Sequence, residues 1–249
     1  DAFISSYQNC YNSSESVSII KVMQLLYNFD KSHDHLIDLN KLLPNGYSYY
    51  TSIKSPIVAV QVANFFLNND SDPNTADMND VYPLEYAIYI ENVNLVETLL
   101  NSNKIELNKK IPIKDESIIS KIKNEYNNNN NTNTNNPFFR SKSSKQNLPS
   151  LVTQSKYKSY LHLAATSKSE ILNLFLKKEL IDINIKDDKG ETPLMDACRS
   201  RSINNIINLF EKDNLDYNQW NNKGEDALRI LNKNADHPED KKEYEIALL

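Results

Sequence analysis

The sequence predicts an all-α solenoid of about five to six divergent helix-turn-helix units, interrupted by one long disordered insertion. Three observations predict it. An asparagine-ended turn recurs at a spacing of 34 residues, as at Asn184 and Asn218. A helix-start pattern precedes each recurrence, and an apolar stretch at helical spacing lies between the two. A fixed period of this size is typical of repeat proteins, whose units bury their apolar faces only against neighbouring units.

The clearest unit begins at Gly190 and shows why each unit should contain two helices. Thr192 can cap the first helix, and Pro193 suits its first position, where a missing N–H costs nothing. The small residues Ala197 and Cys198 let a neighbouring helix approach closely. A second apolar stripe follows at helical spacing and predicts the second helix: Ile203, Ile206, Ile207 and Phe210.

The same order recurs upstream of this unit. The helix start Tyr160–Ala165 and the turn ending at Asn184 form one unit, and Tyr82–Ala87 with Asn108 form another. Asn74 and Asn40 end two earlier units, at the same spacing of 34 residues.

The outer units depart further from the pattern. The first helix expected near Tyr49–Ile53 has lost the Thr-Pro start. At the other end, Gly224–Leu231 is predicted as a final first helix and Pro238–Leu249 as its second helix.

These helix starts and their period resemble the T-P-L-H-x-A core of the ankyrin-repeat family. The resemblance covers most of the chain and is strongest over 159–231. It implies ankyrin-like units over 1–108, an insertion over 109–156, and ankyrin units with a cap over 157–249. The family normally places glycine at the inter-helix turn and after the second helix. This chain has only three glycines, so we expect Lys, Asn and Asp there, and the last two tolerate the left-handed conformation.

Residues 109–156 break the period and are predicted to be a largely disordered insertion on a loop face of the solenoid. The run Asn127–Asn131 and the Ser/Lys-rich stretch 140–145 have compositions that bury nothing. A short helix is expected within 111–126, carrying several isoleucines and packing on the preceding unit. The Ser/Lys stretch fits either a phosphorylation-sensitive docking segment or a solvated linker.

Charge and composition argue against several classes of function. A formal net charge of −5 disfavours nucleic acid as the partner, because such binding rests on phosphate neutralisation. No apolar run is long enough for membrane insertion, and no basic-led signal segment begins the chain. Two cysteines, Cys10 and Cys198, do not make a disulfide framework. Cys198 is expected to be a reduced core thiol, which fits the cytoplasm or the nucleus. The start at Asp1 and the apolar end indicate a piece of a longer protein.

No residue pattern predicts catalysis, so we expect no enzyme activity, no cofactor, no metal and no small-molecule substrate. His33 and His35 flank Asp34 but lack further metal ligands at useful spacing. His162 matches the histidine of the ankyrin helix start, where the resemblance implies a bond to the backbone of a neighbouring loop. His237 precedes a proline and is expected to be exposed.

The resemblance implies binding of a protein partner on the concave side, formed by turn fingers and the exposed face of each first helix. Carried over, the partner-binding residues are Lys186, Asp188, Lys189, Glu191, Arg199, Ser200, Trp220, Asn222, Lys223 and Glu225. Thr166 and Ser167, and in the N-terminal half Tyr89 and Ile90, should face the same way. Trp220 is the only tryptophan, and it either anchors an interface or packs on its own hairpin.

The sequence therefore predicts a protein–protein interaction scaffold. An alternative is an accessory ankyrin module of a larger regulatory protein or enzyme, for example in membrane traffic or transcription, whose active part lies outside this chain. A third reading, an enzyme in its own right, would require turnover that is lost when His162 is changed to Ala.

Overall fold

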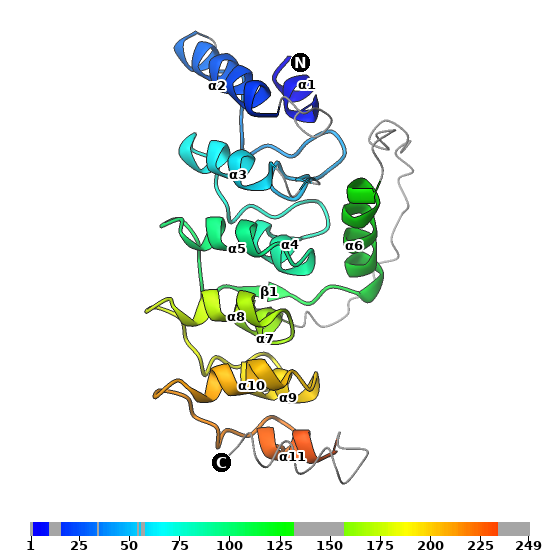
Figure 1. Ribbon diagram of the computed structural model, residues 1–249, viewed down its shortest axis with the longest axis vertical. Coiled ribbons are helices and arrows are strands. Elements are labelled where there is room, and N and C mark those ends of the chain that lie inside the picture. The colour runs from blue at the N-terminus through cyan, green and yellow to red at the C-terminus, as the bar shows by residue number, and fades with distance from the viewer. Residues whose placement is uncertain are drawn as a thin grey trace. The chain divides into compact units, whose positions relative to one another are not determined.

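The computed structural model describes residues 2–9, 16–33, 35–53, 55, 58–131 and 157–233, and these form two compact units (Figure 1). Unit 1 comprises residues 1–105 with 114–152, and unit 2 comprises 106–113 with 153–249. The predictions for Cys10, His237, the second helix 238–249 and the Ser/Lys stretch 140–145 lie outside the described residues.

Unit 1 is helical and has an aromatic core. Its helices are α1 (Ala2–Asn9), α2 (Ser16–Ser32), α3 (Ala59–Asn68), α4 (Pro83–Tyr89), α5 (Val93–Leu100) and α6 (Glu116–Asn131). Helix α2 packs on α1 and α3, and α5 packs on α3 and α4. Between them, the rings of Tyr7, Tyr49 and Phe66 meet with centroids 5.0–5.6 Å apart. Large flat side chains thus fill the space that a repeat interior must close.

The first helix expected near Tyr49–Ile53 is a single turn. Ser52 N donates to Ser48 O at 3.1 Å, and this turn ends before Ile53. Its carbonyls are satisfied from both sides instead. The hydroxyl of Tyr7 in α1 donates to Tyr49 O, and that of Tyr86 in α4 donates to Ile53 O, each at 2.7 Å. Two buried tyrosines therefore replace the missing helical bonds.

The described part of unit 2 contains three successive first helices and two second helices. The first helices are α7 (Tyr160–Ala165), α9 (Pro193–Arg199) and α11 (Ala227–Lys233); the second helices are α8 (Ser169–Leu176) and α10 (Ile203–Phe210). Helix α9 packs between α7 and α11, and α10 packs on α8 and α9. The predicted Thr-Pro start is confirmed, because Thr192 Oγ1 accepts from Met195 N at 3.3 Å and Pro193 occupies the first helical position.

The buried face of α10 differs from the predicted stripe. Ile206 and Leu209 are buried, but Ile207 is 38% exposed. Asn205 is buried beside them, and its amide donates to Ala165 O at 2.9 Å and to Ser167 O at 2.8 Å. A polar side chain thus ties α10 to the turn between α7 and α8, a role that apolar periodicity does not reveal.

Five-residue hairpins precede the first helices, and we call them fingers. They span 43–47 and 77–81 in unit 1, and 187–191 and 221–225 in unit 2. In each, the first N–H donates to the fifth carbonyl at 2.8–3.0 Å. The fourth residue has positive φ: Gly46, Asp80, Gly190 and Gly224. The first side chain closes three of them, as Asp187 Oδ1 accepts from Lys189 N and Glu191 N at 2.8 and 2.9 Å.

The asparagines that mark the period form bridges between consecutive repeats. In unit 2, Asn184 Oδ1 accepts from Asp216 N at 2.8 Å, and its Nδ2 donates to Asn214 O at 2.7 Å. Asn108 makes the same pair of bonds to Asp182 N and Leu180 O. In unit 1, Asn74 Nδ2 donates to Lys104 O at 2.7 Å. The spacing of 34 residues therefore reflects a ladder of amides.

The insertion interrupts a finger. Strands β1 (Lys110–Pro112) and β2 (Tyr157–Ser159) pair antiparallel, with Ile111 opposite Lys158. They are the two arms of the hairpin that leads into α7, and the insertion replaces its tip. The helix expected within 111–126 is present as α6 and extends to Asn131, so the run Asn127–Asn131 is helical and its predicted disorder is wrong. The predicted disorder of 132–156 lies outside the described residues.

Candidate protein-interaction surface

Two fingers of unit 2 carry most of the predicted partner-binding residues. Asp188 and Lys189 lie at the tip of finger 187–191, and Asn222 and Lys223 lie at the tip of finger 221–225; all four are exposed. The fingers are joined to each other, since Asn222 N donates to Lys189 O at 2.9 Å and Asn222 Nδ2 donates to Asp188 O at 3.1 Å. The four side chains therefore stand on one hydrogen-bonded platform.

The base of this platform is polar and buried. Asn221 Oδ1 accepts from Lys223 N and Glu225 N, each at 2.9 Å, and so fixes the second finger as Asp187 fixes the first. The half-buried Glu225 accepts side-chain hydrogen bonds from Lys233 and Asn221. These bonds, that of Lys233 more than that of Asn221, lower the pKa of the Glu225 carboxyl. Hydrogen bonds from the buried side chains of Asp187 and Asn221 thus fix the backbone geometry at the finger tips.

Glu191 does not occupy the exposed position expected for it. The side chain is buried, with 5% of the residue exposed. Its Oε1 accepts from Arg199 Nη2 at 2.5 Å and from Asn221 Nδ2 at 3.1 Å. Glu191 therefore supports the finger from below, and Arg199, which is itself exposed, neutralises this buried carboxylate.

Trp220 precedes the second finger and is 48% exposed. The guanidinium of Arg229 lies 4.6 Å from the ring centroid, within cation–π range. Lys186 Nζ donates to Trp220 O at 2.9 Å, which connects the chain before one finger to the chain before the next. One ring face is thus supported by Arg229, and about half of the residue remains available to solvent.

The remaining predicted residues lie beside this platform or away from it. Ser200 is exposed at the end of α9, where its hydroxyl donates to Ala197 O at 3.1 Å. Thr166 is exposed at the end of α7. In unit 1, Tyr89 and Ile90 are not exposed as expected: they are 9% and 8% exposed.

His162 has the structural role that the resemblance implied. Its Nε2 donates to Glu191 O at 2.9 Å, and its Nδ1 accepts from Ser159 N at 3.3 Å. Burial lowers the pKa of His162, which favours the neutral ring that this pairing requires. The bond connects the helix start of α7 to the finger that precedes α9.

Cys198 is buried, and burial raises the pKa of its thiol to about 12. Such a thiol packs as a small apolar group and is not a nucleophile at neutral pH. Among the described residues, no group of three or more His, Cys, Asp or Glu side chains could hold a metal ion. No helix in the described part of the chain is long and apolar enough to cross a membrane.

Comparisons with known proteins agree with this architecture. Residues 128–221 match a family model described as ankyrin repeats (3 copies). A chain from the complex of the Bd0816 predatory endopeptidase of Bdellovibrio bacteriovorus with the immunity protein Bd3460 is similar, with a TM-score of 0.58 and 15% identity, covering 92% of this chain and 90% of that chain. EF0377, an ankyrin repeat protein, is similar with a TM-score of 0.56 and 16% identity, covering 86% and 85%. No curated protein sequence matches the chain.

The paired helices, the fingers and the asparagine ladder define a helical repeat protein. The family match over 128–221 and the fold shared with a solved ankyrin repeat protein confirm the ankyrin resemblance predicted from the sequence: residues 128–221 carry ankyrin repeats. At 15–16% identity, the solved structures carry the fold alone. Ankyrin repeats are typically non-catalytic modules of protein interaction.

Proposed function

We propose that this chain is a protein–protein interaction scaffold that binds its partner through fingers 187–191 and 221–225 of unit 2. One observation carries the proposal: the finger tips expose Asp188, Lys189, Asn222 and Lys223 on backbones that buried hydrogen bonds hold in place. A binding surface whose loops are already ordered loses less conformational entropy on association. Trp220 adds a partly exposed aromatic ring beside the tips.

The residues of this surface contribute differently to binding. Lys189 and Lys223 are exposed, and they chiefly affect the approach rate and the orientation of the partner. Trp220 supplies apolar area and contributes most to the lifetime of the complex. Arg199 is a poor test of binding, because its removal leaves the buried carboxylate of Glu191 without its cation.

The test needs a partner captured with the whole chain and then purified. We expect Trp220→Ala to weaken its binding by about 2 kcal/mol or more, and Lys189→Ala with Lys223→Ala to slow association in a salt-dependent manner. Lys177→Ala, an exposed lysine at the end of α8, is the matched control and should leave both unchanged. Unaltered affinity in all finger variants, with folding intact by circular dichroism, would place the interface elsewhere.

A further inference from the structure

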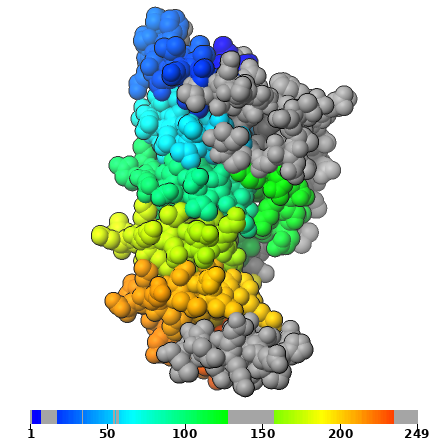
Figure 2. Space-filling model, in the orientation of Figure 1, coloured from blue at the N-terminus to red at the C-terminus, as the bar shows by residue number. Residues whose placement is uncertain are grey.

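The insertion helix α6 covers a surface of unit 1 whose counterpart is open in unit 2. Aligned on their helix starts, Tyr89 and the following Ile90 at the end of α4 correspond to Arg199 and the following Ser200 at the end of α9. The first pair is buried and the second pair is exposed. Helix α6 packs on α4, as Figure 1 and the space-filling view in Figure 2 show. Helix α6, which is not part of the repeat pattern, thus packs on α4, whereas the corresponding end of α9 is exposed.

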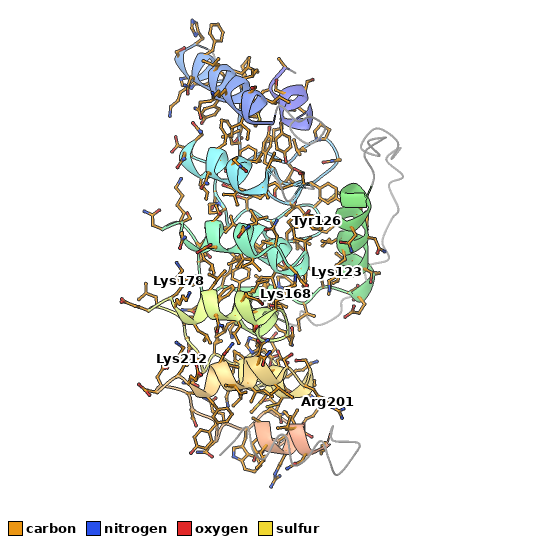
Figure 3. The ribbon with its side chains drawn as sticks, viewed as in Figure 1. Lys123, Tyr126, Lys168, Lys178, Arg201 and Lys212 are labelled. Carbon is orange, nitrogen blue, oxygen red and sulfur yellow. The ribbon has the colours of Figure 1, made fainter. Side chains whose placement is uncertain are left out.

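Helix α6 is amphipathic and turns its apolar side toward the repeats. Ile122 and Tyr126 are 6% and 8% exposed, whereas Lys121, Lys123 and Asn124 are exposed. Figure 3 labels Tyr126 and Lys123 on this helix. A helix of 16 residues with an asparagine-rich end is marginal by itself in water, so α6 depends on its docking site.

Polar contacts hold α6 near both of its ends and at separate elements of unit 1. Before the helix, Lys114 Nζ lies 3.9 Å from Glu85 Oε2 of α4, with both side chains buried. Near its C-terminal end, Tyr126 OH accepts from Asn92 Nδ2 at 3.3 Å, at the start of α5. Tyr47 OH of finger 43–47 donates to Glu125 Oε2 at 3.1 Å. The contacts define the register of α6 as well as its position.

The receiving groups are also held by hydrogen bonds within the repeats, without α6. Glu85 also accepts from Tyr89 OH at 2.9 Å and from Tyr82 N at 3.1 Å, both within or next to α4. Asn92 Oδ1 caps α5 by accepting from Leu95 N at 3.0 Å, which leaves its NH₂ to face Tyr126. The site is therefore built before the helix arrives, as expected for a receptor surface and its ligand.

We infer that finger 43–47, α4 and the start of α5 form a helix-binding surface, and that α6 is its built-in ligand. The surface fits an amphipathic helix with apolar residues four apart, a carboxylate for Tyr47 and a preceding lysine for Glu85. A partner helix of this chemistry must displace α6 to bind. The inference goes beyond the proposed function, which concerns the fingers of unit 2.

The test uses the whole chain and a labelled peptide with the sequence of residues 113–127 as the probe. Ile122→Asp should release α6, and the peptide should then bind this variant at one site, at least tenfold more tightly than it binds the wild-type chain. Lys123→Asp, on the exposed side of α6, is the matched control and should behave as the wild type. A peptide that itself carries Ile122→Asp should not bind.

Hydrogen exchange of α4 and α5 completes the test. Protection of both helices in the Ile122→Asp variant, without peptide binding, overturns the inference, and so does equal binding to variant and wild type. A second variant replaces 113–131 with a glycine-serine segment of equal length. If its α4 is unprotected and the peptide does not restore protection, α6 is a structural part of unit 1 and not a ligand.

Discussion

Residues at positive φ show how the repeats turn with so few glycines. Glu91 and Arg201 occupy the turns between first and second helices at φ 53° and 56°, and Asp70 follows α3 at φ 64°. The expectation of Lys, Asn or Asp at such places holds for Asp70 but is wrong for the inter-helix turns, where Glu91 and Arg201 stand. A residue with a Cβ pays about 1 kcal/mol or more in this conformation.

Replacing Arg201 with Gly should therefore stabilise the chain by roughly 0.5–1 kcal/mol, because relief of the left-handed strain exceeds the added entropy of the unfolded chain. Ser200→Gly is the neighbouring control, since Ser200 has a φ of −82° and gains no relief. It should destabilise by about 0.5–1 kcal/mol. Urea unfolding of both variants checks the pair, and shifts of the same sign would refute the strain argument.

Glu85 is the residue whose burial should be visible in a pH titration. Burial raises the pKa of its carboxyl from the ordinary value of 4.5 to about 7, and the facing groups Lys114, the Tyr82 amide and the Tyr89 hydroxyl only partly offset this. Asp77, whose own pKa is raised by burial, adds a like charge nearby. The folded chain therefore holds the Glu85 proton more tightly than the unfolded chain does.

The direction of the pH dependence of stability follows from this tighter binding of the Glu85 proton in the folded chain. The stabilisation linked to Glu85 is complete below pH 4.5 and is lost as the pH rises to about 7. The Glu85→Gln variant lacks this titration, so its stability relative to the wild type should increase across that window, by an amount on the order of 3 kcal/mol, and then level off. Urea unfolding of both proteins from pH 5 to 8 measures the difference. A difference that is constant with pH would contradict the raised pKa.

At the scale of elements, the amide ladder couples each repeat to the next. Asn184 bonds both an N–H and a C=O of the turn that follows α10. Asn184→Ala should cost about 1 kcal/mol, the usual net value of such bonds, and should loosen residues 211–218 first. Asn218→Ala is the control, since no bond from its side chain is present among the described residues, and it should cost less than about 0.5 kcal/mol. Equal losses in urea unfolding would show that the bridge contributes nothing.

The elements also show which features the sequence could predict. The Thr-Pro start of α9 and the asparagine spacing are local signals, so they predicted the helices and their period correctly. The single turn at 48–53 depends on Tyr7 and Tyr86, which lie far away in sequence, and no local pattern encodes them. The burial of Asn205 follows from carbonyls left open at the end of α7, which apolar periodicity cannot detect.

The candidate site was predictable to a similar extent. The fingertip positions of Lys189 and Lys223 follow from the repeat register, and both are exposed. The burial of Glu191 could not be predicted, because it depends on Asn221 in the next finger and Arg199 at the far end of α9. Tyr89 and Ile90 are buried, and α6 packs on α4, the helix at whose end they lie; the repeat pattern carries no trace of an element from an insertion.

For the whole molecule, we propose two recognition surfaces: the fingers of unit 2 and the surface of unit 1 that includes α4. The fingers of unit 2 are open and their backbones are fixed, which suits direct binding of a protein. The corresponding side of α4 in unit 1 is occupied by α6. A partner that presents an amphipathic helix would compete at the second surface, and one that presents a polar loop would engage the first.

The central claim is that a protein partner contacts the fingers of unit 2, and the single tryptophan of the chain allows a direct measurement. Trp220 replaced throughout by 5-fluorotryptophan gives one fluorine resonance beside finger 221–225. On titration of the chain with the purified partner, we expect this resonance to shift to saturation at one equivalent and to become less accessible to a soluble paramagnetic reagent. A partner that binds fully while the resonance and its accessibility stay unchanged would show that it does not contact finger 221–225.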